Sequence, residues 1–256
     1  SASTTESIQA QFYLATAGVA VEEQIEGVQA AFKLSVATMG DFIQTTQLMG
    51  QLLNTFGKSV ELGFLDPFSK TERLTDSLSQ TIQRFQVTLP VLQEGLKFLI
   101  GPAAQLNVQL DELNVTLGAL NTAGFRGTLA GTALSNMFNK LGRAIDKLDL
   151  DPSEFQDLEG NLISITAFLD SIAKALENTS PLEGQLKLIE VFDIRAGRIA
   201  KTMVDLRRQI EKTANEFQLM RGATEAMART IETTTSTSFK QFRNSVQNIA
   251  TSVGKE

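Results

Sequence analysis

The chain has 256 residues, and its 23 lysines and arginines against 29 aspartates and glutamates give a formal net charge of -6 at pH 7. This balance argues against a general nucleic-acid binder, because such proteins neutralise phosphates with a basic surface. Hydrophobic residues make up 42% and charged residues 20% of the chain, which favours a packed core over disorder.

Histidine and cysteine are both absent. Their absence removes the commonest general base, the usual ligands of soft metals and every thiol nucleophile. We therefore predict a protein that is not an enzyme, with no catalytic residue, no metal site and no cofactor.

The most apolar stretch, residues 87–106, is interrupted by polar and charged side chains. No uncharged run approaches the roughly 18 to 20 residues that a membrane span needs, so we expect no span in this sequence. Because the sequence begins with Ser1 rather than methionine, we expect it to be part of a longer polypeptide.

Apolar residues recur at spacings of three and four, the period of an amphipathic helix. One such stripe passes through Leu162, Ile165, Leu169 and Ile172. No sustained alternation of period two is present, so the predicted class is all-α. Glycines, prolines and capping residues between the stripes set the boundaries. The ten predicted helices are 4–17, 21–38, 41–56, 70–87, 90–105, 110–123, 127–146, 163–178, 182–192 and 195–232.

The predicted helices are expected to form a bundle of hairpins with one tight turn. Gly124 and Gly127 bracket Phe125, so positive φ costs little there and the phenylalanine can enter the groove between two helices. The next helix opens with small residues that allow close approach to a neighbour. Tight packing is favoured over a ligand cradle, because no phosphate-loop Gly-Lys-Ser/Thr follows. The predicted turn and close-packing residues are Gly101, Pro102, Gly124, Phe125, Gly127, Ala130, Gly131 and Ala133.

The last predicted helix differs from the others in length. As one helix, 195–232 would extend about 55 Å, which predicts an arm. We therefore expect a compact core at 1–193 and an arm at 194–256, with a weak point at the Ser/Thr-rich run 233–238. Its narrow apolar seam favours a coiled-coil partner, either an earlier helix of this chain or a second copy. The candidate self-association residues are Ile199, Met203, Leu206, Ile210 and Phe217.

Charged residues in the chain suggest no chemistry beyond solvation. The positive cluster within 195–212 contains Asp205 and Glu211, which favours a solvated, ion-paired face; contact with an acidic tube lumen or with DNA is the alternative. Carboxylate pairs in the loop 148–161 could hold a metal ion, but the loop offers no pocket of other polar groups, and we favour solvation.

Four motifs follow one another between residues 88 and 141. They are the Gly-Pro-Ala-Ala step at 101–104, a leucine stripe over 110–120, the turn Ala-Gly-Phe-Arg-Gly at 123–127, and Ala-Gly-Thr-Ala-Leu at 130–134. In this order they resemble the core of phage tail tape measure proteins, and similarity extends over about residues 10–205. The sequence departs from that family at Asp193, where the family usually has glycine, and at the loop 58–69.

The resemblance implies a structural protein of a phage tail, part of the tape measure that determines tail length, scaffolds tube assembly and is released before DNA ejection. It also implies a homo-oligomer, expected to be a trimer, whose partners are tail tube, tail tip or baseplate proteins and tail assembly chaperones, with no sequence-specific nucleic acid. The expected location is the virion, in the tail tube lumen or tail tip, and the host cytoplasm during assembly.

The many glycine and proline breaks predict that the chain folds back on itself, as in a terminal or anchoring module rather than an extended ruler. The alternative function is a non-enzymatic helical adaptor or signalling bundle that binds partners through its C-terminal helix. A hydrolase is the third hypothesis, which the lack of histidine and cysteine disfavours.

Overall fold

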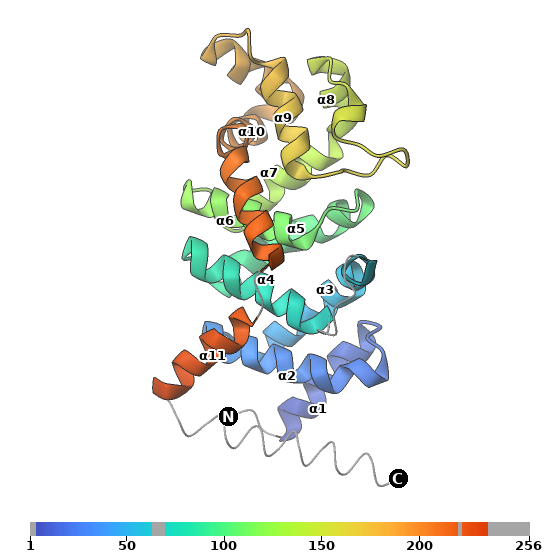
Figure 1. Ribbon diagram of the computed structural model, residues 1–256, viewed down its shortest axis with the longest axis vertical. Coiled ribbons are helices and arrows are strands. Elements are labelled where there is room, and N and C mark those ends of the chain that lie inside the picture. The colour runs from blue at the N-terminus through green and yellow to red at the C-terminus, as the bar shows by residue number, and fades with distance from the viewer. Residues whose placement is uncertain (1–3, 63–69, 220–221, 235–256) are drawn as a thin grey trace. The chain divides into compact units, whose positions relative to one another are not determined.

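The computed structural model describes residues 4–62, 70–219 and 222–234 (Figure 1). These residues form helices joined by turns and contain no strand, only an isolated bridge between Gln156 and Leu162. The predicted all-α class is therefore confirmed. The chain divides into two compact units, the first containing the described residues up to Gln80 together with 222–234, and the second containing Thr81–Leu219.

The first unit packs four helices around the beginning of a fifth. They are α1 (Thr4–Thr16), α2 (Val21–Thr38), α3 (Phe42–Leu62), the start of α4 (Lys70–Phe85), and α11 (Ala223–Thr234). Helices α1, α2 and α3 pack against one another, and α11 packs along α2. Their shared core is apolar and includes the buried Leu14, Leu34, Leu52 and Phe56. At the start of α3 the carboxylate of Asp41 accepts a hydrogen bond from the Gln44 amide at 2.8 Å, which satisfies one of the free donors of the helix end.

The second unit contains the end of α4 and the remaining helices. They are α5 (Leu89–Gln105), α6 (Leu110–Thr122), α7 (Thr128–Asn139), α8 (Leu141–Leu148), the 3-10 turn η1 (Pro152–Glu154), α9 (Ile165–Ala175) and α10 (Pro181–Leu219). Helix α5 packs along α7, and α10 packs against α6, α7, α8 and α9. The predicted stripe at 162–176 supplies fully buried core residues, because Ile165, Leu169 and Ile172 have no exposed surface.

The single helix predicted at 127–146 is wrong. The chain leaves helical geometry at Lys140, which ends α7 and precedes α8. Beyond the break the buried face consists of Leu141, Ala144 and Leu148, whereas Ile145, which continues the helical spacing of Met137 and Leu141, is only half-buried. The turn at Lys140 therefore allows α8 to present a different face to α10 than a straight helix would.

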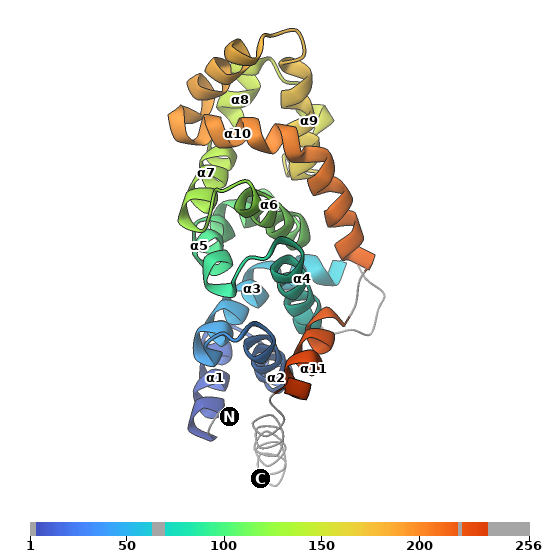
Figure 2. The ribbon, with the colours of Figure 1, turned by 90° about the vertical axis from the view of Figure 1, so that its left-hand side faces the viewer.

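The long C-terminal helix is confirmed as α10, and it changes direction where the sequence predicted a break between residues 192 and 195 (Figure 2). Asp193 is non-helical there, with φ 70° and ψ 169°. Close approach at this corner requires Gly197, because a Cβ on it would lie 2.6 Å from the carbonyl oxygen of Leu188.

The prediction that one helix continues to residue 232 is wrong. Helix α10 ends at Leu219, and a separate helix, α11, begins at Ala223 after Gly222, whose φ is +74°. Because α10 packs within the second unit and α11 within the first, residues 195–232 do not form one straight arm of about 55 Å. The division at residue 193 stays a prediction, and most of the weak point at 233–238 lies outside the described residues.

Among the described residues, no helix combines the length and the apolar character that crossing a bilayer would require.

Candidate functional site

The predicted close-packing residues lie where α5 meets α7. Gly131 is the tightest point: a Cβ placed on it would lie 2.3 Å from the carbonyl oxygen of Gly95 and 2.7 Å from the Gly95 Cα. The two helices therefore meet backbone to backbone, and the small side chains of Ala130 and Ala133 are buried on either side. This contact joins segments that are 36 residues apart in sequence, and its second glycine was not predicted.

The turn between α6 and α7 has the expected glycine geometry. Gly124 and Gly127 have φ of +93° and +48°, and Phe125 between them is half-buried. Gly101 and Pro102 lie inside the last turns of α5, where a Cβ added to Gly101 would meet no atom within 4 Å apart from its chain neighbours and the backbone of its own helix. Thus Gly127 and Gly131 leave no room for a side chain and Gly124 requires a positive φ, whereas neither reason applies to Gly101.

The predicted self-association seam is largely covered by the chain itself. Ile199, Met203, Ile210 and Phe217 are each at most 5% exposed, and Leu206 is half-buried. The helix that carries them packs against α6, α7 and α9, so earlier helices of the same chain occupy its apolar face. Self-association through these residues stays a prediction, and it would require α10 to leave these neighbours.

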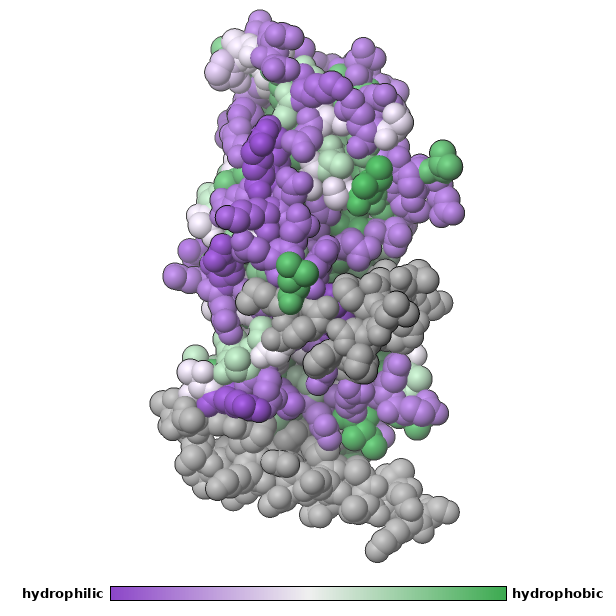
Figure 3. Space-filling view, viewed as in Figure 1, coloured by the Kyte–Doolittle hydropathy of each residue, from purple (hydrophilic) through white to green (hydrophobic). Residues whose placement is uncertain are grey.

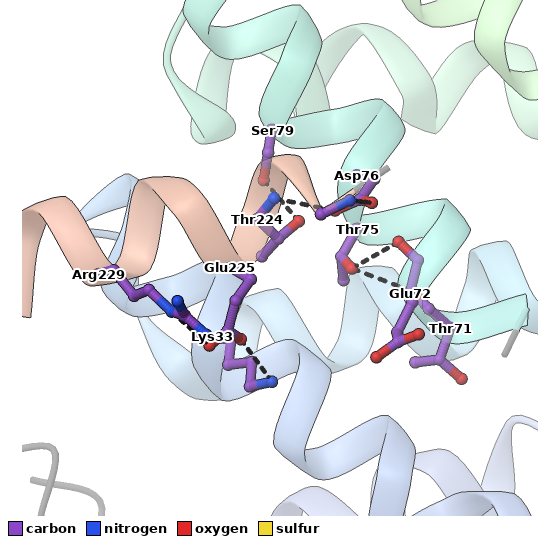
Figure 4. Close-up of polar contacts among 10 residues, drawn as sticks. Lys33, Thr71, Glu72, Thr75, Asp76, Ser79, Thr224, Glu225 and Arg229 are labelled. Atoms are coloured by element: carbon purple, nitrogen blue, oxygen red, sulfur yellow. Dashed lines mark hydrogen bonds and ion pairs between the residues drawn. The ribbon is translucent and has the colours of Figure 1, made fainter. Parts of the chain in front are cut away.

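A set of polar contacts attaches the last described helix to the first unit; we call it the α11 clasp (Figure 4). The carboxylate of Asp76 on α4 accepts hydrogen bonds from the backbone amides of Gly222 at 2.6 Å and Thr224 at 2.8 Å. Ser79 and Thr224 share a hydroxyl hydrogen bond of 2.9 Å. Asp76 thus satisfies free donors at the α11 N-terminus and places negative charge at the positive end of its dipole.

A second contact of the clasp comes from α2. The Lys33 ammonium lies 2.7 Å from the Glu225 carboxylate, and Arg229 pairs with the same carboxylate at 3.1 Å. The hydrogen bond from Lys33 lowers the pKa of Glu225, which keeps this carboxylate ionised. Both partners of the Lys33 pair are more than a third exposed, so the pair fixes the register of α11 more than it adds stability.

The clasp borders a cavity of about 370 Å³ between α2, α4 and α11. Four carboxylates line it, those of Glu26, Glu72, Asp76 and Glu225, with Lys33 as the cation. Partial burial raises the pKa of Glu72, and the neighbouring charge of Glu26 adds to the effect. Among the described residues no group of three or more acidic side chains has a geometry suited to a metal ion. The contacts that the structure shows here hold the start of α11 against α2 and α4.

The second unit contains a comparable cap at Glu112 of α6. Its carboxylate accepts hydrogen bonds from the amides of Ile165 at 2.8 Å and Thr166 at 2.9 Å and from the Thr166 hydroxyl at 3.0 Å. It therefore caps the start of α9 from another helix. Burial raises the pKa of Glu112, and the two backbone hydrogen bonds oppose that rise.

Sequence reasoning missed both capping carboxylates. Asp76 lies between Leu74 and Leu78, which are spaced four apart on α4, and it is buried where its carboxylate meets the amides at the start of α11. The partners of Glu112 follow it by 53 and 54 residues. The spacing of residues within one helix cannot predict hydrogen bonds between segments so far apart in the sequence.

The remaining charged candidates behave as solvated residues. Lys201 pairs with Asp205 at 2.5 Å and Arg207 with Asp170 at 2.6 Å, as expected for an ion-paired face. In the loop after α8, the exposed Asp151 and Asp157 accept hydrogen bonds from nearby backbone amides, and these bonds hold turns together.

Backbone contacts between helices and carboxylate caps between distant segments define an all-α protein built from packed helices. The chain belongs to the family of phage-related minor tail proteins, whose family profile matches residues 1–183. It is also similar to the tape measure protein of Pneumococcus phage Dp-1, with 20% identity over 253 residues. The alignment covers 97% of this chain and 21% of that relative, so the chain spans about a fifth of the relative's length. No solved structure matches the chain.

These comparisons confirm the resemblance to phage tail tape measure proteins. The chain is a structural protein of a phage tail and is associated with the virion.

Proposed function

We propose that the chain is a folded segment of a tape measure protein, the component that determines tail length, scaffolds assembly of the tail tube and is released before DNA ejection. The observation that supports this most strongly is the alignment of 97% of the chain with a tape measure protein, together with the family match over residues 1–183. We also propose that the protein is not an enzyme.

The helix breaks indicate whether this segment contributes to the length that the tape measure protein sets. A ruler made of continuous helix adds 1.5 Å of length per residue, so 256 residues in one helix would add about 380 Å. Here the chain forms two packed units, and α10, the longest described helix, bends at Asp193. We infer that the segment acts as a folded anchoring module whose contour length does not enter the measured tail length.

The proposed partners are further copies of the same chain, with three as the expected number, and tail tube, tail tip or baseplate proteins and tail assembly chaperones. The proposed location is the tail tube lumen or the tail tip, with the host cytoplasm during assembly. The alternative, an adaptor that binds partners through its C-terminal helix, is less well supported because α6, α7 and α9 already cover the apolar face of α10.

The test is an in-frame deletion of these 256 residues from the complete tape measure gene, followed by electron microscopy of tails. We expect tails to fail to assemble, or to be shorter by far less than 380 Å. The matched control removes the same number of residues from a predicted uninterrupted helical stretch of the same polypeptide, which should shorten tails by about 380 Å.

Two results would count against the proposal in different ways. Functional tails shortened by the full 380 Å would contradict the folded module and leave the ruler role. Infectious particles with unchanged tails would contradict a role in tail assembly altogether.

A further inference from the structure

A groove of about 750 Å³ lies in the second unit between α7 and the bend of α10. Apolar side chains from both helices line it, and two of them are open to solvent: Leu129 is 42% and Ile194 61% exposed. On the face drawn in Figure 3, hydrophobic residues form small patches within a largely hydrophilic surface. The groove therefore presents apolar surface that no described part of the chain covers.

Two polar groups of the groove have no partner in the described part of the chain. The side-chain oxygen of Asn136 is shielded from solvent and accepts no hydrogen bond. The exposed guanidinium of Arg195 makes no hydrogen bond or ion pair there. A matching occupant would bring an apolar side chain for the floor and a carboxylate for Arg195.

The bend keeps the groove in one shape. Asp193 has a positive φ of 70°, a conformation that glycine adopts without steric cost and other residues rarely adopt. Its carboxylate holds the bend to α7, because it accepts hydrogen bonds from Asn136 and Lys140. The wall formed by Ile194 and Arg195 is thus fixed relative to α7.

The same unit carries a projecting tip with the complementary properties. Leu158 is fully exposed at the end of the loop between η1 and α9, flanked by Asp157 and Glu159. In Figure 1 this loop extends beyond α8 and α9. The apolar side chain of Leu158 matches the apolar groove, and a carboxylate beside it matches the guanidinium of Arg195.

The tip is held rigid by its own hydrogen bonds. One carboxylate oxygen of Asp157 accepts the amides of Glu159 and Asn161, each at 2.9 Å. At the base of the loop the Ile163 amide donates to the Phe155 carbonyl oxygen at 2.9 Å. A tip that is already ordered loses little conformational entropy when it binds. Glu159 keeps a carboxylate oxygen available, since only its other oxygen accepts a bond, from Asn161 at 3.3 Å.

We propose that Leu158 of one copy of this chain inserts into the α7–α10 groove of a second copy, with Glu159 pairing with Arg195. Tip and groove are different parts of one surface, so the contact is heterologous and repeats from copy to copy. Closure after three copies would give the trimer that the family resemblance implies. The contact specifies how copies would meet in the proposed tail assembly, and association in solution measures it without tails.

The test is sedimentation equilibrium of the full chain over a range of concentrations. We expect the average mass to rise with concentration, and Leu158→Ser to raise the dissociation constant about ten- to hundred-fold, because one leucine leaves an apolar site. Leu182→Ser is the matched control, since Leu182 is 69% exposed and does not line the groove. It should leave association unchanged. Circular dichroism should show equal helix content in all variants.

A charge exchange tests the polar half of the contact. Arg195→Glu should weaken association, and adding Glu159→Arg to the same chain should restore it, which a general loss of stability would not do. Because the chain has no cysteine, an equimolar mixture of Leu158→Cys and Thr132→Cys chains should also form a disulfide-linked dimer under oxidation. A mixture of Leu182→Cys and Thr132→Cys chains should form far less.

A chain that stays monomeric at every concentration would overturn the proposal and leave the groove to a different partner. Association that Leu158→Ser does not weaken would also overturn it, because another surface would then join the copies. Neither result would bear on the tail role, which the deletion experiment tests separately.

Discussion

The glycine contact between α5 and α7 provides the most direct test of the packing. In Gly131→Ala the added Cβ would lie 2.3 Å from the Gly95 carbonyl oxygen, whereas non-bonded heavy atoms are at their best near about 3.5 Å. The helices must therefore separate by about 1 Å. Because the obstructing atoms are backbone, no rotamer change can relieve the clash. Overpacking of this kind costs about 1–3 kcal/mol, and alanine returns about 1 kcal/mol through its higher helix propensity.

We therefore expect Gly131→Ala to lower the free energy of unfolding by up to about 2 kcal/mol. Gly142→Ala is the matched control, because Gly142 is also helical, in α8, but a Cβ there meets nothing within 4 Å and no proline follows it. It should stabilise the chain by about 0.5–1 kcal/mol. Urea unfolding followed by circular dichroism measures both, and hydrogen exchange of α5 and α7 amides localises the change. If Gly131→Ala were as stable as Gly142→Ala, the backbone contact would not constrain the packing, and the steric reasoning would be refuted.

Three further predictions concern single carboxylates. Asp76→Ala should cost about 1–2 kcal/mol and speed hydrogen exchange in α11, because two amide donors lose their acceptor; unchanged exchange in α11 would contradict the cap. Burial raises the pKa of Glu112 in the folded state, so the folded chain binds its proton more tightly than the unfolded chain does. The unfolding free energy of the wild type relative to Glu112→Gln should therefore fall as pH rises above the ordinary glutamate value of about 4.5. Urea titrations that show a rise would reverse the assigned sign. At the bend of α10, Asp193→Gly should be about 1–2 kcal/mol more stable than Asp193→Ala in thermal unfolding, because only glycine adopts its positive φ freely, and equal stability would argue against backbone strain.

Local patterns predicted most helices, because helix formation there is decided by residues three and four apart. The stripe through Ile165, Leu169 and Ile172 is an example, since all three are fully buried in α9. Gly124 and Gly127 were likewise readable as a turn, because glycine is the residue that takes positive φ without cost. The order of these motifs along the chain was sufficient to identify the family.

The helix break at Lys140 has no such signal. Neither glycine nor proline occupies that position, and the chain turns there so that α8 can pack on α10. The break at Gly222 carried a glycine, but a single glycine inside an apolar period does not decide between a continuous helix and a turn. At both positions tertiary packing determines that the helix breaks.

The candidate sites were predictable only in part. Gly131 was identifiable as a close-packing residue from its small neighbours, but its partner Gly95 was not, because the pairing depends on how α5 and α7 cross. The caps made by Asp76 and Glu112 join residues that lie far apart in sequence, so no window along the chain contains both members. Likewise, the complementarity of Leu158 and the α7–α10 groove becomes visible only once exposure is known.

The α11 clasp has a mechanical consequence, because it joins two segments of the first unit that lie on either side of the second unit in the sequence. Residues 81–219 are inserted between the two sequence segments that the clasp joins, Lys33 and Asp76 on one side and Thr224 and Glu225 on the other. Tension applied to residues 4 and 234 therefore loads the first unit alone, and the inserted unit bears no force until α11 detaches. Synthesis gives the opposite order of events, because the second unit is complete before α11 has been made. The second unit can therefore finish folding on the ribosome before the first unit does.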